Sequence, residues 1–164
     1  MLKALSDSER QPVDISAVSG GLLTRSGSVI TTVGSAIARV LTGAVYISAG
    51  YEAARAPGGR VGKASDTLSR IRRVMPLPVD NELIVRANGA AQLTAGTTLA
   101  LGFKPRLSAA VLAASLLPTT IAGHAFWTIE DPLEQRSQLL QFLKNMAMFG
   151  GLLLATIDSP RSSR

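Results

Sequence analysis

Polar and ionisable residues stand at the ends of several apolar segments of this 164-residue chain, where they could bind a ligand or a partner. Arg86 and Lys144 are cations beside apolar runs, and Glu52 is the natural anionic partner of either. An ionisable group inside a membrane span is costly and is treated by default as functional. Two cations, one anion, two amides and one imidazole leave surplus positive charge, which suits a carboxylate, an oxyanion or the carbonyl of a quinone. The candidate binding residues are Glu52, Arg86, Asn88, His124, Trp127, Lys144 and Asn145.

A structural interpretation of the same residues stays open. Arg86 and Lys144 could extend from helix ends to lipid phosphates, while Trp127 anchors the chain at the interface. His124 fits a structural role in a loop better than a catalytic one. The functional interpretation depends on these residues gathering at one place.

The chemistry available to the chain is limited by its composition. It has no Cys and a single His. These counts exclude disulfides, thiolate metal sites, iron–sulfur clusters and a haem held by two His of this chain. His124 and Glu52 could handle a proton, but no nucleophile or cofactor motif accompanies them. We therefore expect no metal site, no intrinsic cofactor and no intrinsic catalytic activity.

Four long segments carry almost no charge, and a helix needs about 20 mostly apolar residues to cross a bilayer. The segment after Leu107 lacks the polar stripe that a soluble helical bundle would show. The sequence predicts an all-α fold, a four-transmembrane-helix bundle. Its membrane domain is expected over 33–158, with spans at 33–51, 83–101, 107–122 and 139–157.

The segments outside the spans differ in character. Residues 1–32 are predicted to form a polar, flexible tail without a cleavable signal, and 159–164 a short C-terminal tail. The first loop is basic, and its stretch SDTLSRIRRVM predicts a short amphipathic helix in the lipid headgroup layer. A solvated loop is the alternative. With a net charge of +6, this pattern favours anionic lipid as a partner and not nucleic acid.

The connectivity of four spans determines which residues share a membrane interface. The first and third loops lie on one side, which brings the candidate binding residues together. Both termini lie on the other side, and the KPR turn at 104–106 favours the cytoplasm for them. Arg39 precedes Glu52 by 13 positions, or about 20 Å of helix, so it belongs nearer the opposite side. The secondary intramembrane polar residues are Arg39, Tyr46 and Gln92.

Small residues recur four positions apart, a spacing that lets helices approach closely in lipid. The pairs are Ala109 with Ala113, Ala110 with Ala114, and Ala147 with Gly151. A chance result of the alanine-rich composition is the alternative, and the pattern names no partner face.

Several stretches together resemble the DoxX family of small four-helix bacterial membrane proteins. They are RVLTGAVYISAGYEAARAP, LIVRANGAAQLTAGTTLALG, LPTTIAGHAFW and FLKNMAMFGGLLLATID, and the resemblance covers about 38–158. Where the AGH-x-FW stretch often has Pro after the His, this chain has Ala125. The motif positions are occupied by Arg86, Asn88, Gly89, His124, Phe126, Trp127, Phe142, Lys144 and Asn145.

The resemblance implies a location in the bacterial plasma membrane and a link to quinones. The family takes its name from a small subunit associated with a terminal quinol oxidase, and related DoxD proteins belong to thiosulfate:quinone oxidoreductases. Some relatives are linked to oxidative-stress defence.

Two functions are compatible with these observations. The first is a non-catalytic accessory subunit of a redox, quinone-linked or cell-envelope complex, whose polar end binds a quinone, an anionic lipid or a partner protein. The alternative is a binder or carrier of an anion or quinone-like lipid, with Arg39 as a second site and Pro118 loosening its helix. A homo-oligomer is compatible with either function.

Overall fold

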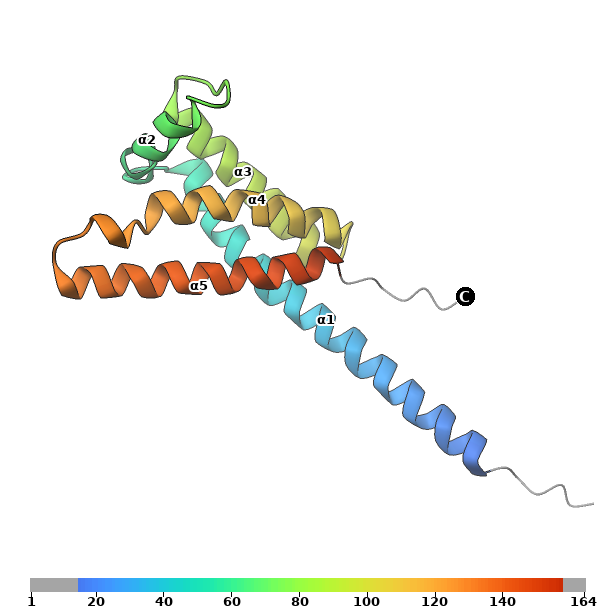
Figure 1. Ribbon diagram of the computed structural model, residues 1–164. Coiled ribbons are helices and arrows are strands. Elements are labelled where there is room, and N and C mark those ends of the chain that lie inside the picture. The colour runs from blue at the N-terminus through green and yellow to red at the C-terminus, as the bar shows by residue number, and fades with distance from the viewer. Residues whose placement is uncertain (1–14, 158–164) are drawn as a thin grey trace, which may run out of the picture. The chain divides into compact units, whose positions relative to one another are not determined.

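The computed structural model describes residues 15–157, with side chains from residue 29 onward. The described residues form helices and connecting loops without a strand, which confirms the all-α prediction for this part of the chain. Residues 1–14 of the predicted N-terminal tail and the predicted C-terminal tail lie outside the described residues. The elements are α1 Ile15–Arg55, α2 Arg60–Ile71, α3 Asn81–Ala100, α4 Pro105–Gly123, the 3₁₀ turn η1 Phe126–Thr128 and α5 Pro132–Ile157 (Figure 1).

Helix α1 begins earlier than the sequence led us to expect. The chain divides into two units, residues 1–35 and 36–164, and the backbone of the first unit is helical from Ile15 onward. Residues 15–32, expected in the tail, thus belong to α1, and the flexibility of the tail stays a prediction. No proline stands between Ile15 and Arg55, so nothing in the segment interrupts the helical backbone hydrogen bonds.

Three helical segments are long and apolar enough to cross a membrane: Val29–Arg55, Pro105–Thr128 and Pro132–Ile157. They contain the predicted spans 33–51, 107–122 and 139–157. The fourth predicted span, 83–101, is a helix in the structure, α3, but does not reach the same apolar character. Glu82, Arg86, Asn88 and Gln92 lower its hydropathy. Three of the four predicted spans are thus confirmed by length and composition.

Capping residues explain where the helices begin and turn. The Asp80 carboxylate accepts from the backbone N–H groups of Glu82 (2.8 Å) and Leu83 (3.2 Å), which fixes the start of α3. At the tight connection to α4, Gly102 has φ 72° and Lys104 has φ 43°. Both residues therefore have a left-handed backbone conformation. Glycine adopts it freely, whereas for Lys104 it carries strain.

Helices α1 and α3 pack backbone to backbone through four glycines, Gly43 and Gly50 facing Gly96 and Gly89, which we call the glycine seam. A Cβ atom on Gly43 would lie 2.6 Å from the carbonyl oxygen of Gly96. One on Gly89 would lie 2.6 Å from the backbone nitrogen of Ala54. The two glycines of each helix are seven positions apart, so they lie on the same face of that helix. The pairing runs in opposite chain directions, and the two helices are antiparallel.

Helix α4 is central to the packing, because it contacts α2, α3 and α5. Its neighbour α5 runs beside it in Figure 1, and Leu152 of α5 is buried in the same core as Leu112 and Leu116 of α4. Of the predicted small-residue pairs, Ala109 and Ala113 are buried in this core. In contrast, Ala110 and Ala114 are exposed, and no atom within 4 Å would meet a Cβ on Gly151.

Helix α4 continues through Pro118 without a break. The hydroxyl groups of Thr119 and Thr120 donate to carbonyl oxygens one turn earlier, on Ser115 and Leu116. These hydroxyl groups add hydrogen bonds to carbonyls in the turn that precedes the proline, although the carbonyl that Pro118 leaves without its usual donor is that of Ala114. The broken-helix geometry typical of transport sites is therefore not found at this position.

The first loop contains a helix, α2, but it lies at 60–71 and not over the whole stretch SDTLSRIRRVM (65–75). Its Leu68 is buried, and the helix contacts α3 and α4. The location of α2 in a headgroup layer stays a prediction. After α2, the Arg72 guanidinium donates to the carbonyl oxygens of Pro78 (2.6 Å) and Val79 (2.9 Å) and to Oδ1 of Asn81 (2.7 Å). This arginine holds the loop that leads into α3.

Candidate functional site

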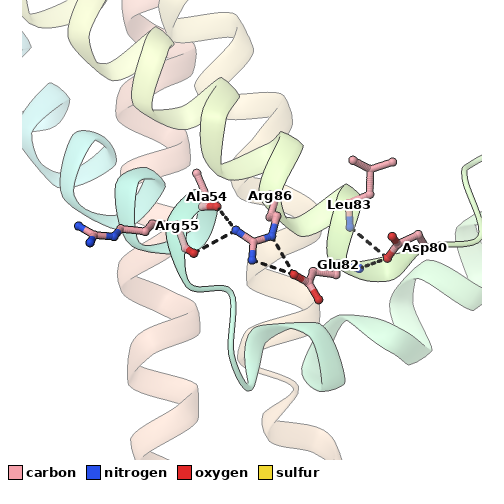
Figure 2. Close-up of polar contacts among 6 residues, drawn as sticks. All are labelled: Ala54, Arg55, Asp80, Glu82, Leu83 and Arg86. Atoms are coloured by element: carbon pink, nitrogen blue, oxygen red, sulfur yellow. Dashed lines mark hydrogen bonds and ion pairs between the residues drawn. The ribbon is translucent and has the colours of Figure 1, made fainter.

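Arg86 joins the end of α1 to the beginning of α3 (Figure 2). Its Nη1 donates to the carbonyl oxygens of Ala54 (2.6 Å) and Arg55 (3.0 Å), and its Nε donates to Oε1 of Glu82 (2.8 Å). The last carbonyls of a helix have no intrahelical partner and carry partial negative charge, so a cation is favourable there. The structure thus gives Arg86 a capping contact within the protein.

Glu52 pairs with neither of its predicted partners. Its carboxylate lies 2.9 Å from the guanidinium of Arg60, at the start of α2. Arg86 has its own carboxylate one turn earlier, on Glu82, and the Lys144 ammonium donates to Oε1 of Gln141 at 3.1 Å. The prediction of a Glu52 ion pair with Arg86 or Lys144 is therefore wrong, because each cation is satisfied by a residue nearer in sequence.

A polar chain crosses the interface between α3 and α4. The Gln92 Nε2 donates to Oγ of Ser115 (2.8 Å), and this hydroxyl donates to Oδ1 of Asn88 (2.8 Å). Gln92 and Ser115 are buried. Because Asn88 and Gln92 are four positions apart on one helix face, a single hydroxyl on α4 serves both amides.

Replacing Ser115 with alanine tests this polar chain. We expect the free energy of unfolding to fall by about 1 kcal/mol, because the buried Gln92 amide loses its partner. Reversible unfolding of the purified protein in mixed micelles measures the change. Ser115→Thr retains a hydroxyl and serves as the conservative comparison. An unchanged free energy of unfolding in Ser115→Ala would show that these hydrogen bonds contribute nothing to stability.

Two further hydrogen bonds tie α4 and its end to α5. The Asn145 Nδ2 donates to Oγ1 of the fully buried Thr120 at 3.1 Å. The Nδ1 of His124 lies 2.8 Å from Oε1 of Gln138. A carboxamide oxygen only accepts, so Nδ1 carries the proton in this bond. His124 therefore orients the loop after α4 against α5.

Three aromatic rings gather between η1 and α5. The rings of Phe126, Trp127 and Phe142, which we call the aromatic cluster, meet edge to face with centroid distances of 5.1 to 6.0 Å. The chain has only 4 Phe, 2 Tyr and 1 Trp, so this gathering is not a consequence of composition. Trp127 is 53% exposed, and Lys144, two positions after Phe142, is exposed as well. The cluster presents an aromatic surface, and the Lys144 ammonium, on another face of α5, donates to Gln141.

Arg39 and Tyr46 lie earlier in α1 than the carbonyls that Arg86 contacts. The guanidinium of Arg39 is beside Gly102, at 3.7 Å from the position of a Cβ atom there. Gly102 stands in the turn between α3 and α4, so Arg39 is at the opposite end of α3 from Arg86, as expected. The Arg39 Nε and the Tyr46 hydroxyl are buried without a hydrogen-bond partner among the described residues.

The predicted site residues therefore form several contacts and not one pocket. Arg86, Asn88, Gln92, His124 and Asn145 each bond to another helix or to a segment next to one, whereas Trp127 and Lys144 stay exposed. Within residues 29–157, no group of three or more His, Asp or Glu could hold a metal ion. Sequence reasoning missed Ser115, Thr120 and Gln138, which carry no signal beyond being polar. It also missed the glycine seam, which a spacing of seven could have revealed.

Comparison with known proteins gives one match. A family model described as DoxX matches residues 34–125 of the chain. No curated protein and no solved structure matches it. The matched region contains Glu52, Arg86, Asn88 and His124 and ends just before the aromatic cluster.

Proposed function

The chain belongs to the DoxX family of membrane proteins, and from this premise we propose that it is a non-catalytic accessory subunit of a membrane complex. The complex would be redox- or quinone-linked, or would belong to the cell envelope. We place the protein in the bacterial plasma membrane, with both termini in the cytoplasm and α3 as the fourth span. The packing of α3 against both α1 and α4 supports this span, since its polar side chains find partners inside the protein.

The observation that carries the proposal is the aromatic cluster with its exposed Trp127; Lys144 is exposed on another face of α5. The other predicted binding residues on α3, α4 and α5 are largely occupied by internal hydrogen bonds. The rings suit the head of a quinone or the aromatic groups of a partner protein, and an exposed ammonium on the same helix suits acidic groups of that partner. Trp side chains are also enriched in interface hot spots. The binding end is therefore the segment from η1 to the first half of α5.

No catalytic step is assigned to this end. The one imidazole, His124, is oriented by Gln138, and its role in the proposal is to hold the η1 segment in place. An anionic lipid would bind here through the Lys144 ammonium alone. A second copy of the chain is compatible with the same surface.

Replacing Lys144 or Trp127 with alanine tests the proposal. In mild-detergent affinity purification from native membranes, we expect the wild-type chain to retain a stoichiometric protein partner or a quinone. Loss of the hot-spot side chain Trp127 should reduce the retained amount about tenfold or more. Loss of the rim cation Lys144 should reduce it about fivefold. Mass spectrometry of the co-purifying proteins and extracted lipids measures both.

The matched control for Lys144→Ala is Lys63→Ala, which removes an exposed lysine from α2. Equal helix content of all variants, measured by circular dichroism, shows that the chain still folds. Equal retention in Trp127→Ala, Lys144→Ala and Lys63→Ala would contradict the assignment of the binding end.

A further inference from the structure

A shallow groove of about 440 Å³ lies between α3 and α4, at the end of these helices away from the aromatic cluster. Short side chains of α3 form its floor, among them Ala90, Ala91 and Thr94. Leu107 of α4 lines its other side, and Phe103 and Lys104 stand at the turn between the helices. The groove shares no residue with the proposed binding end.

The lining of the groove is apolar. Three lining residues carry hydroxyl groups, Thr94, Thr98 and Ser108, and those of Thr98 and Ser108 lie 2.8 Å apart in a hydrogen bond. Thr98 Oγ1 also approaches the carbonyl oxygen of Thr94 at 3.1 Å. The hydroxyls of Thr98 and Ser108 are therefore occupied within the protein, and the rest of the floor offers mostly methyl and methylene groups. A hydrocarbon chain gains from such a surface through close packing.

The turn end of the groove is positively charged. Lys104 is exposed there, its ammonium 5.7 Å from the ring centre of Phe103, and the Arg39 guanidinium lies beside the neighbouring Gly102. The carboxylates of the described residues lie elsewhere, in α2 or next to the opposite ends of the helices: Glu52, Asp66, Asp80, Glu82, Glu130, Asp131 and Glu134. An anionic group at this turn therefore meets Lys104 and Arg39, with Arg106 in the first turn of α4, and none of these carboxylates.

We propose that the groove binds one acyl chain of an anionic phospholipid, with the Lys104 ammonium contacting the lipid phosphate. The positive charge at the turn favours an anionic headgroup, and the apolar floor of the groove packs against the acyl chain. Lys104 adopts a left-handed backbone, and local strain of this kind is common where a side chain must be held in place for a ligand. This lipid site does not depend on the accessory function proposed above.

Native mass spectrometry of the full-length protein tests the site, with phosphatidylglycerol and phosphatidylcholine of identical acyl chains as probes. We expect the wild-type protein to retain phosphatidylglycerol about fivefold more than phosphatidylcholine, the contribution of one cation near a membrane surface. Lys104→Gln should reduce this preference to less than half, and Lys104→Arg should restore it. Ala90→Leu fills the groove and should reduce the retention of both lipids about tenfold.

Two matched variants serve as controls. Lys63→Gln removes an exposed lysine from α2, and Ala110→Leu enlarges an exposed alanine of α4 outside the groove. Both should retain lipid as the wild type does. Equal retention of the two lipids by the wild type, or no effect of Ala90→Leu, would overturn the proposal. A co-purifying quinone that Ala90→Leu displaces while phosphatidylglycerol stays bound would overturn it too.

Discussion

Replacing Gly50 with alanine is expected to lower the free energy of unfolding by about 3 kcal/mol, the upper part of the usual range for an overpacked core. The new Cβ would lie 2.5 Å from the backbone nitrogen of Leu93 and 2.6 Å from the carbonyl oxygen of Gly89. Both atoms belong to the backbone of α3, so no side chain can rotate away. The two helices must separate, and the contacts along the glycine seam weaken together. Unfolding in mixed micelles, followed by circular dichroism, measures the change.

Gly151→Ala is the matched control for Gly50→Ala. Gly151 also lies inside a helix, but nothing within 4 Å would meet its Cβ atom. Gly151→Ala should therefore leave the free energy of unfolding equal or slightly higher, because alanine has a higher helix propensity than glycine. If both substitutions changed stability by the same amount, the seam would not be a close backbone contact.

Arg86→Ala is expected to lower the free energy of unfolding by about 2 kcal/mol, the typical contribution of hydrogen bonds to a charged group. The substitution leaves the carbonyl oxygens of Ala54 and Arg55 without their donor. The partly exposed pair with Glu82 adds little to this value, because solvent screens it. The loss should be observed in the isolated protein, without any partner or ligand.

Two further variants separate the contributions of Arg86. Glu82→Gln removes only the ion pair and should cost a few tenths of a kcal/mol. Arg86→Lys keeps the charge but lacks the planar fork, so it should restore only part of the lost stability. An isolated Arg86→Ala protein as stable as the wild type would refute the capping role and return Arg86 to the candidate ligand-binding residues.

The membrane helices were predictable because their signal is the absence of charge. The uncharged runs around Leu112 and Leu152 belong to two of these helices, and both leucines are buried in one core with Leu99 of α3. The start of α1 at Ile15 was not predictable in this way. Its first turns are rich in Ser, Gly and Thr, and such a composition is typical of flexible tails as well as of helices in close packing.

The candidate site was predicted by residue type better than by partner. Arg86 was recognised as unusual, but its acceptors at Ala54 and Arg55 are more than thirty positions away in the sequence. Backbone carbonyls occur at every position, so no pattern identifies the ones that a side chain will reach. The pair with Glu82 was visible, since the two residues are four apart on a helix. The glycine spacing acquires meaning only once α1 and α3 are known to be antiparallel.

The modest hydropathy of α3 has a consequence for how the protein reaches the bilayer. As the proposed fourth span, α3 is too polar to partition from water into lipid efficiently by itself. Its surface becomes compatible with lipid when the seam glycines lie against α1 and Gln92 is bonded to Ser115 of α4. Because α1 is synthesised first and α4 last of the three, α1 must remain near the site of insertion until its partners emerge. With α3 as the proposed fourth span, we expect insertion to be cooperative, and damage to the seam should reduce the amount of inserted protein before it affects any activity.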